Sequence, residues 1–155
     1  MSSLTFESSR RSKSETSPVN VPNSVIEIVS PYNLSEINIK EGEHRNVKAT
    51  IGLSKSNPEN GIEILGDYKG TPVQIFVYEN LNIVANGRDF DVNPSQQKTI
   101  SIKLNIHKLL ENITSTELDN AVVSAGTIVI AMDPNLNLYS KIKSNLNSAT
   151  EIAVE

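Results

Sequence analysis

Apolar and polar residues alternate in short segments of this chain, and this alternation constrains its fold more than any other feature of the sequence. The pattern is clearest at 47–54 and 100–107, where every second residue is apolar. Successive side chains of a β-strand point to opposite faces, so the pattern is typical of a strand with one buried face. Further strands are predicted at 25–29, 36–40, 62–67, 72–78, 79–85 and 126–132.

Two turn signals separate predicted strands. Residues 67–70 read Asp-Tyr-Lys-Gly, which places Asp and Gly at the first and last positions that favour them in a type I turn. Pro72 has no N–H to donate, but it is tolerated as the first residue of a strand. We therefore expect a β-hairpin here rather than a ligand-binding turn. Asn86-Gly87 predicts a second turn.

The apolar period changes from that of a strand to that of a helix in two places. Leu109, Leu110 and Ile113 suit a short helical turn at 107–113. Asp133 is expected to cap a helix that begins at Pro134, because Asp is a favoured N-cap and Pro a favoured first residue. The apolar stripe of this helix is predicted to be Leu136, Tyr139, Ile142 and Leu146.

Several short strands at close spacing predict a mainly β fold. We expect an antiparallel, immunoglobulin-like β-sandwich with a short helical turn and one C-terminal amphipathic helix. The length of 155 residues fits one domain, which we place at 24–155. Residues 1–23 are rich in Ser, Thr, Pro and charge, which predicts a flexible tail. Arg10, Arg11 and Lys13 are expected to form a solvated basic cluster in it.

Composition argues against several classes of function. The chain has no cysteine, which removes disulfides, thiolate metal sites and thiol nucleophiles. Its formal net charge of −4 gives no general attraction to nucleic acid. No run of about 18 apolar residues is present, so no transmembrane segment is predicted. Residues 1–20 lack the apolar segment of ~7–15 residues typical of a secretory signal. This predicts either a cytoplasmic protein or one whose signal has been removed.

Asp89, Asp91 and Asn93 are spaced like the first three ligands of a calcium-binding loop. Alternate residues of a tight loop can point their oxygens at one ion. However, Pro94 stands where that motif has its turn glycine, and Ile100 stands where it has a bidentate Glu. A solvated acidic loop is therefore the preferred interpretation, and no metal or cofactor is predicted.

The inventory of catalytic groups is small. His44 lies in a polar turn and His107 on the polar face of a predicted strand, which argues against a zinc site or a Ser-His-Asp triad. Phosphate-binding glycine motifs are absent. Asp67 and Glu79 are candidates for the paired acids of a glycan hydrolase, but any folded surface offers such pairs. We predict no catalytic, cofactor-binding or metal-binding residue.

Two surface features remain as alternatives. Phe76, Tyr78 and Phe90 could form an aromatic binding platform, although such residues in strands more often pack against their neighbours. Residues 33–35 and 112–114 match the N-glycosylation sequon, which matters only in a eukaryotic secretory pathway.

Three segments together resemble small β-rich domains of unknown function in secreted lipoproteins of Bacteroidota. They are ILGDYKGTPVQIFV, ISIKLNIHKLLENI and GTIVIAMDPNLNLYSKIKSNL, and the resemblance covers residues 25–148. It implies a strand–turn–strand hairpin, a strand leading into a short helix, and a closing helix after a last strand. It also implies a location in the cell envelope or outside the cell. Members of that family begin with a signal peptide and a lipid-bearing Cys, which this sequence does not show.

The function expected from these features is non-enzymatic. The first hypothesis is a β-sandwich of the cell envelope or the extracellular space, whose surface loops bind an unknown protein or glycan. The alternative is a structural subunit of a larger assembly, such as a phage particle or a filament, and self-association is compatible with either. The glycan hydrolase that would use Asp67 and Glu79 ranks last.

Overall fold

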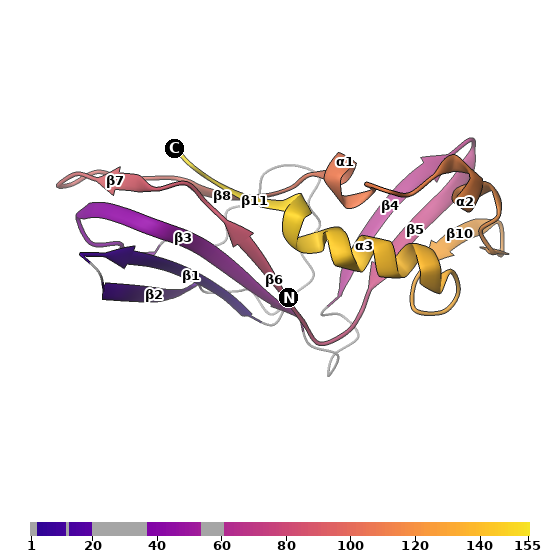
Figure 1. Cartoon of the computed structure of the whole chain (residues 1–155), viewed down its shortest axis with the longest axis horizontal. Helices are drawn as coiled ribbons and strands as arrows, with labels where there is room; N and C mark the ends of the chain where they lie inside the picture. The colour runs from indigo at the N-terminus through magenta and orange to yellow at the C-terminus, as the bar shows by residue number, and fades with distance from the viewer. Residues whose placement is uncertain (1–2, 12, 20–36, 54–60) are drawn as a thin grey trace.

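The computed structural model describes residues 3–11, 13–19, 37–53 and 61–155. Within these residues the protein is mainly β, with few helices and two sheets, as the alternation predicted. The molecule is elongated, and the two sheets lie toward its opposite ends (Figure 1). The last helix, α3 (Leu136–Ala149), runs along the four-stranded sheet toward the seven-stranded one (Figure 1).

The seven-stranded sheet contains both ends of the described chain. Its strand order is β2-β1-β3-β6-β11-β8, and β7 also pairs with β3. The longest strand, β3, therefore has two partners on one side: β6 along its C-terminal half and β7 along its N-terminal half. The bounds are β1 Ser3–Arg10, β2 Lys13–Val19, β3 Gly42–Leu53, β6 Leu81–Asn86, β7 Phe90–Val92, β8 Ile100–Leu104 and β11 Thr150–Val154.

The four-stranded sheet has the order β4-β5-β10-β9. Its bounds are β4 Ile62–Tyr68, β5 Thr71–Val77, β10 Thr127–Ile130 and β9 Val123–Ser124. The hairpin predicted between β4 and β5 is confirmed, with Tyr68 opposite Thr71. Its loop is Lys69-Gly70, and both residues have positive φ, 52° and 82°. That is the geometry of a type I′ turn rather than the predicted type I turn, because its twist matches that of the flanking strands. The carboxylate of Asp67 accepts a hydrogen bond from the N–H of Gly70 at 2.9 Å.

Three helices lie among the described residues: α1 Ile106–Leu109, α2 Ser115–Asp119 and α3 Leu136–Ala149. The short helical turn and the terminal helix were predicted, and α2 was not. The prediction that Asp133 caps a helix starting at Pro134 is wrong. The N-cap is Asn135, in the left-handed conformation, so α3 begins at Leu136. Of the predicted apolar stripe, Tyr139, Ile142 and Leu146 are buried, as expected, together with Leu138 and Ala149. Leu136, at the first position of the helix, is exposed instead.

Two apolar clusters form the core. The larger one joins both sheets to α1 and α3, and the smaller one lies on the seven-stranded sheet. The larger contains Leu53, Ile75, Val77, Ile83, Leu109, Ile128, Ile130, Leu138, Tyr139, Ile142, Leu146 and Ala149. The smaller contains Leu4, Phe6, Val47, Ala49, Ala85 and Ile152. No helix in the part of the chain that the structure describes is both long and apolar enough to cross a membrane.

The flexible tail predicted at 1–23 is wrong for residues 3–10 and 13–19, which form the hairpin β1–β2. Strand β1 pairs with β3 as well as β2. Leu4 and Phe6 are each only 4% exposed, because they pack in the smaller cluster together with Val47 and Ala49 of the neighbouring strand β3. Burial of these two side chains and the strand pairing of β1 with β2 and β3 both oppose the entropy cost of ordering the segment.

Three other expectations also need correction. The sheets are not purely antiparallel, because β5–β10 and β6–β11 are parallel pairs. Residues 37–40 form no strand, although Ile37 and Ile39 pack on the smaller cluster. Asn86-Gly87 does not reverse the chain, since β6 and β7 on either side of it both run antiparallel to β3. The strand expected at 25–29 lies outside the described residues.

Candidate functional site

The two histidines lie apart and in different environments. His44 is completely buried, and its ring stacks on Phe90 with centroids 5.1 Å apart. Its Nδ1 lies 2.8 Å from the hydroxyl of Ser8, and its Nε2 lies 2.8 Å from the carbonyl oxygen of Lys40. His107 is exposed on α1. His44 is therefore a buried residue with both nitrogens hydrogen-bonded, and not the turn residue that the sequence suggested.

The calcium-like spacing of Asp89, Asp91 and Asn93 falls on extended chain rather than on a tight loop. Asp91 is in β7, opposite Glu43 of β3, and Asp89 accepts a hydrogen bond from the N–H of Asn46 at 3.2 Å. Same-face residues of a strand are roughly 6.6 Å apart. Two oxygens that bind one calcium ion, each about 2.3–2.6 Å from it, are at most about 5 Å apart. No cluster of His, Asp and Glu that could hold a metal ion occurs within the described ranges.

Asp67 and Glu79 do not form a pair of acids. Asp67 lies opposite Pro72 at the start of β5, and Glu79 follows the end of that strand. The five steps of β5 from Pro72 to Val77, at about 3.3 Å each, already span roughly 16 Å. Glycoside hydrolysis requires the two carboxyl groups only ~5–10 Å apart. The Glu79 carboxylate is bound instead by Lys143 Nζ at 2.6 Å and by the hydroxyl of Tyr139. Burial, reinforced by the bond to Glu79, raises the pKa of Tyr139.

Only two of the three aromatic side chains come together. Phe76 and Tyr78 stack with centroids 5.8 Å apart, whereas Phe90 lies in the other sheet beside Phe6. The sequon at 112–114 lies on exposed chain between α1 and α2, and Thr114 is the N-cap of α2. The sequon at 33–35 lies outside the described residues.

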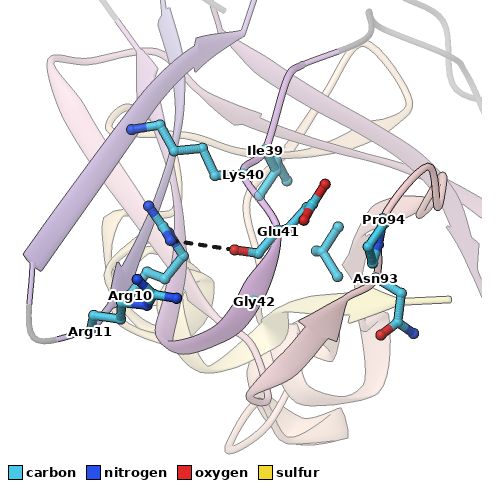
Figure 2. A pocket seen from close by; sticks show the side chains of 9 residues that line it. Arg10, Arg11, Ile39, Lys40, Glu41, Gly42, Asn93 and Pro94 are labelled. Carbon is cyan, nitrogen blue, oxygen red and sulfur yellow. Dashed lines mark hydrogen bonds between the residues drawn. The ribbon is translucent and has the colours of Figure 1, made fainter.

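A cleft of about 720 Å³ brings together three segments that are far apart in the sequence. Arg10 is the last residue of β1 and Arg11 follows it, residues 39–42 lead into β3, and residues 92–94 begin at the last residue of β7. Arg10 and Arg11 lie on one side, and Asn93 and Pro94 lie on the other (Figure 2). We call this site the arginine cleft. It is open to solvent, and its walls come from strand ends and loops.

Arg10 is held in place by its neighbours. Its Nε and Nη2 both donate to Oε1 of Glu15, at 3.2 and 3.1 Å, and its Nη1 donates to the carbonyl oxygen of Glu41 at 3.4 Å (Figure 2). The hydrogen bond from Arg10, and the charge of Lys40 at 3.6 Å, lower the pKa of Glu15. Glu15 is therefore ionised at neutral pH and fixes the guanidinium of Arg10 at the cleft.

Arg11 is different, because its side chain has no such anchor. It is exposed, its φ is 48°, and it makes no hydrogen bond or ion pair with any residue that the structure describes. On the far wall, the backbone of Asn93 bonds Gln96, but its side-chain amide has no partner among the described residues. Both walls thus present polar groups that are available to a ligand.

Sequence reasoning noticed the basic residues but not the cleft. Arg10 and Arg11 were interpreted as charges of a solvated tail, and Lys13 does not line the cleft, whereas Lys40 does. The opposite wall is more than eighty positions away in the sequence. Compared with models of protein families, with curated proteins and with solved structures, the chain matches none of them. The resemblance to small β-rich lipoprotein domains therefore stays a prediction.

Proposed function

We propose that the protein is a non-enzymatic binding domain that holds an anionic ligand in the arginine cleft. The observation that carries this proposal is the exposed guanidinium of Arg11, which has no partner among the described residues and lies beside the anchored Arg10. A guanidinium offers five N–H donors in a fork that matches the oxygens of a carboxylate or a phosphate. Binding of this kind needs no nucleophile and no tuned acid or base.

The scaffold around the cleft supports the proposal. Arg10, Glu41 and residues 92–94 are attached to strands of one sheet, so their backbones are held by the β1–β3 and β3–β7 pairs. Our proposal includes that this scaffold is a β-sandwich. In its favour, β1 and β8 lie toward opposite edges of the seven-stranded sheet and still contribute to one apolar cluster, as expected where a sheet folds over onto itself.

The proposal is tested by titrating the isotope-labelled protein with acetate, inorganic phosphate and D-glucuronate while recording amide chemical shifts. At least one anion should shift the amides of Gly42 and Asn93 in a saturable manner. The shifts should weaken as salt is added, because ions screen the exposed charge of Arg11. Arg11→Gln should abolish the response. Arg88→Gln removes the same charge from an exposed residue outside the cleft and should leave it intact.

Absence of any saturable shift, or an equal response of the two variants, would overturn the proposal. Arg11 makes no bond to the described chain, so the melting temperature of Arg11→Gln should match that of the unsubstituted protein. A folded variant that no longer responds therefore reports on binding and not on stability.

A second candidate function is a structural subunit of a larger assembly. In its favour, five apolar side chains among the described residues are more than half exposed: Leu65 by 73%, Val122 by 57%, Val123 by 53%, Met132 by 53% and Leu136 by 58%. The side chain of Asn135 hydrogen-bonds the N–H and the carbonyl of Val122, which places Val122 near the start of α3. Sedimentation velocity over a range of concentrations should then reveal self-association that Leu136→Ser weakens. A monomer at every concentration argues against this candidate.

A further inference from the structure

We infer that the ligand of the arginine cleft is a sugar acid, meaning a pyranose ring that carries one carboxylate, such as a uronic acid residue of an acidic glycan. This inference rests on the proposed function and names the class of ligand. Three features of the cleft carry it: its local charge, the single free guanidinium fork, and the polar and apolar groups around that fork.

The local charge matches a monoanion. Three cations lie at the cleft, namely Arg10, Arg11 and Lys40. Two carboxylates accompany them, Glu41 in the lining and Glu15 paired with Arg10 and Lys40. Three positive and two negative charges leave one positive charge, which a single carboxylate neutralises. A dianionic phosphate would leave an excess of negative charge beside Glu41, and like charges at close range repel.

The free donors favour a planar group with two oxygens. Arg10 already uses its Nε–Nη2 edge on Glu15, so it has no complete fork to offer. No residue in the described part of the chain accepts a hydrogen bond from the guanidinium of Arg11, so its whole fork of N–H donors is available. A carboxylate binds such a fork through two parallel N–H···O bonds. One complete fork therefore fits one carboxylate.

The rest of the cleft fits the body of a sugar. The side-chain amide of Asn93 has a donor and an acceptor that face no described partner, which suits ring hydroxyl groups. Ile39, Val92 and Pro94 supply apolar surface for the C–H face of the ring. Gly42, at φ 117°, adds no side chain to the lining. The volume of about 720 Å³ falls within the ~300–1,000 Å³ of small-ligand sites.

An acidic peptide would supply the same carboxylate, but the cleft offers fewer hydrogen bonds to a peptide backbone. Recognition of an extended peptide usually adds a strand to an open sheet edge. β1 has no open edge, because it lies between β2 and β3. β7 pairs only with β3 among the described strands, but its three residues offer a short edge. The chain after β7 continues into Pro94, which has no N–H to donate. The observations therefore favour the sugar acid.

The test is a calorimetric titration of the full chain with five probes at the same ionic strength. They are D-glucuronate, D-glucose, acetate, D-glucose 6-phosphate and a peptide of alternating Asp and Ser. Glucuronate should bind at least about tenfold more tightly than each of the others, since it alone joins one carboxylate to a ring of hydroxyls. Arg11→Gln should weaken glucuronate binding by about tenfold or more, while Arg88→Gln should have no effect.

The outcomes separate the two proposals. Tighter binding of glucose 6-phosphate, acetate or the peptide, lost in Arg11→Gln, would overturn the sugar-acid inference and leave the binding-domain proposal in place. Binding of glucose as tight as that of glucuronate would also overturn the inference, because the carboxylate would then contribute nothing. If no probe binds in an Arg11-dependent manner, both proposals are wrong.

Discussion

The hydroxyl of Ser8 lies 2.8 Å from Nδ1 of His44, and both side chains are buried. The carbonyl oxygen of Lys40, 2.8 Å from Nε2, can only accept a hydrogen bond. Nε2 therefore carries the ring proton, and in the neutral ring Nδ1 accepts from Ser8. These two bonds join β1 to β3 and to the segment that lines the arginine cleft.

Ser8→Ala should destabilise the protein, because it leaves a buried ring nitrogen without a partner. Such a group costs about 1–3 kcal/mol of unfolding free energy, measurable by urea denaturation. Ser14→Ala, on the exposed part of β2, provides the control and should change stability by less than about 0.5 kcal/mol. Equal stabilities of the two variants would show that the Ser8–His44 bond contributes nothing.

The β1–β2 hairpin should be required for stability. Phe6 is 4% exposed and packs in the smaller core cluster, so Phe6→Ala should lower the unfolding free energy by about 3–5 kcal/mol. Thr16→Ala, at an exposed position of β2, should be close to neutral. Thermal melting distinguishes them. If Phe6→Ala melts with the unsubstituted protein, residues 3–10 behave as the tail that the sequence suggested.

Two leucines of α3, two positions apart, should differ sharply in their contributions. Leu138 is 1% exposed in the larger core cluster, and Leu136 is 58% exposed. Leu138→Ala should cost about 2–5 kcal/mol, whereas Leu136→Ala should cost less than about 0.5 kcal/mol. Chemical denaturation of both variants checks this difference. The opposite order would mean that α3 packs by the stripe predicted from the sequence.

Stability at low pH should depend on Glu117. Hydrogen bonds from Lys141, and then from Thr114, lower the pKa of Glu117 from 4.5 to about 2. Because the folded-state pKa lies below the unfolded one, ionised Glu117 stabilises the protein above about pH 4.5, and this contribution is lost as the pH falls toward 2. Glu117→Gln should therefore be destabilised at pH 7, and its difference from the unsubstituted protein should shrink at pH 2.

The control for this pH dependence is Glu111→Gln, which removes the same charge from an exposed residue between α1 and α2. Urea denaturation at pH 7 and at pH 2 measures both variants. A deficit of Glu117→Gln that is equally large at the two pH values would contradict the assignment, because it would then arise from packing and not from ionisation.

The alternation of apolar and polar residues was enough to predict those strands in which it is regular. Residues 47–53 and 100–104 belong to β3 and β8, and the hairpin at 67–70 was found from its turn chemistry. β1 was missed because Ser, Thr and charged residues occupy most of its positions, and only Leu4 and Phe6 mark its buried face. Two alternating apolar residues are too few to distinguish a strand from a flexible tail when the partner strand is unknown.

Long-range placement could not be predicted. The parallel pair β5–β10 joins residues more than fifty positions apart, and no local pattern encodes such a pairing. The cleft depends on the same kind of information, since Arg10 and Asn93 meet only after β3 has paired with both β1 and β7. For Asp89, Asp91 and Asn93 the sequence instead suggested a site that the fold does not form. Its residue types suit an ion, but the extended backbone of β7 spreads them apart.

The helix α3 ends at Ala149, and β11 begins at the next residue, Thr150. No loop lies between them to absorb a displacement. A pull along β11, which is hydrogen-bonded to β6 and β8, is therefore passed directly to α3 and through its buried stripe to the four-stranded sheet. We therefore expect the two sheets to be mechanically coupled through this junction, so that a displacement of one sheet is transmitted to the other.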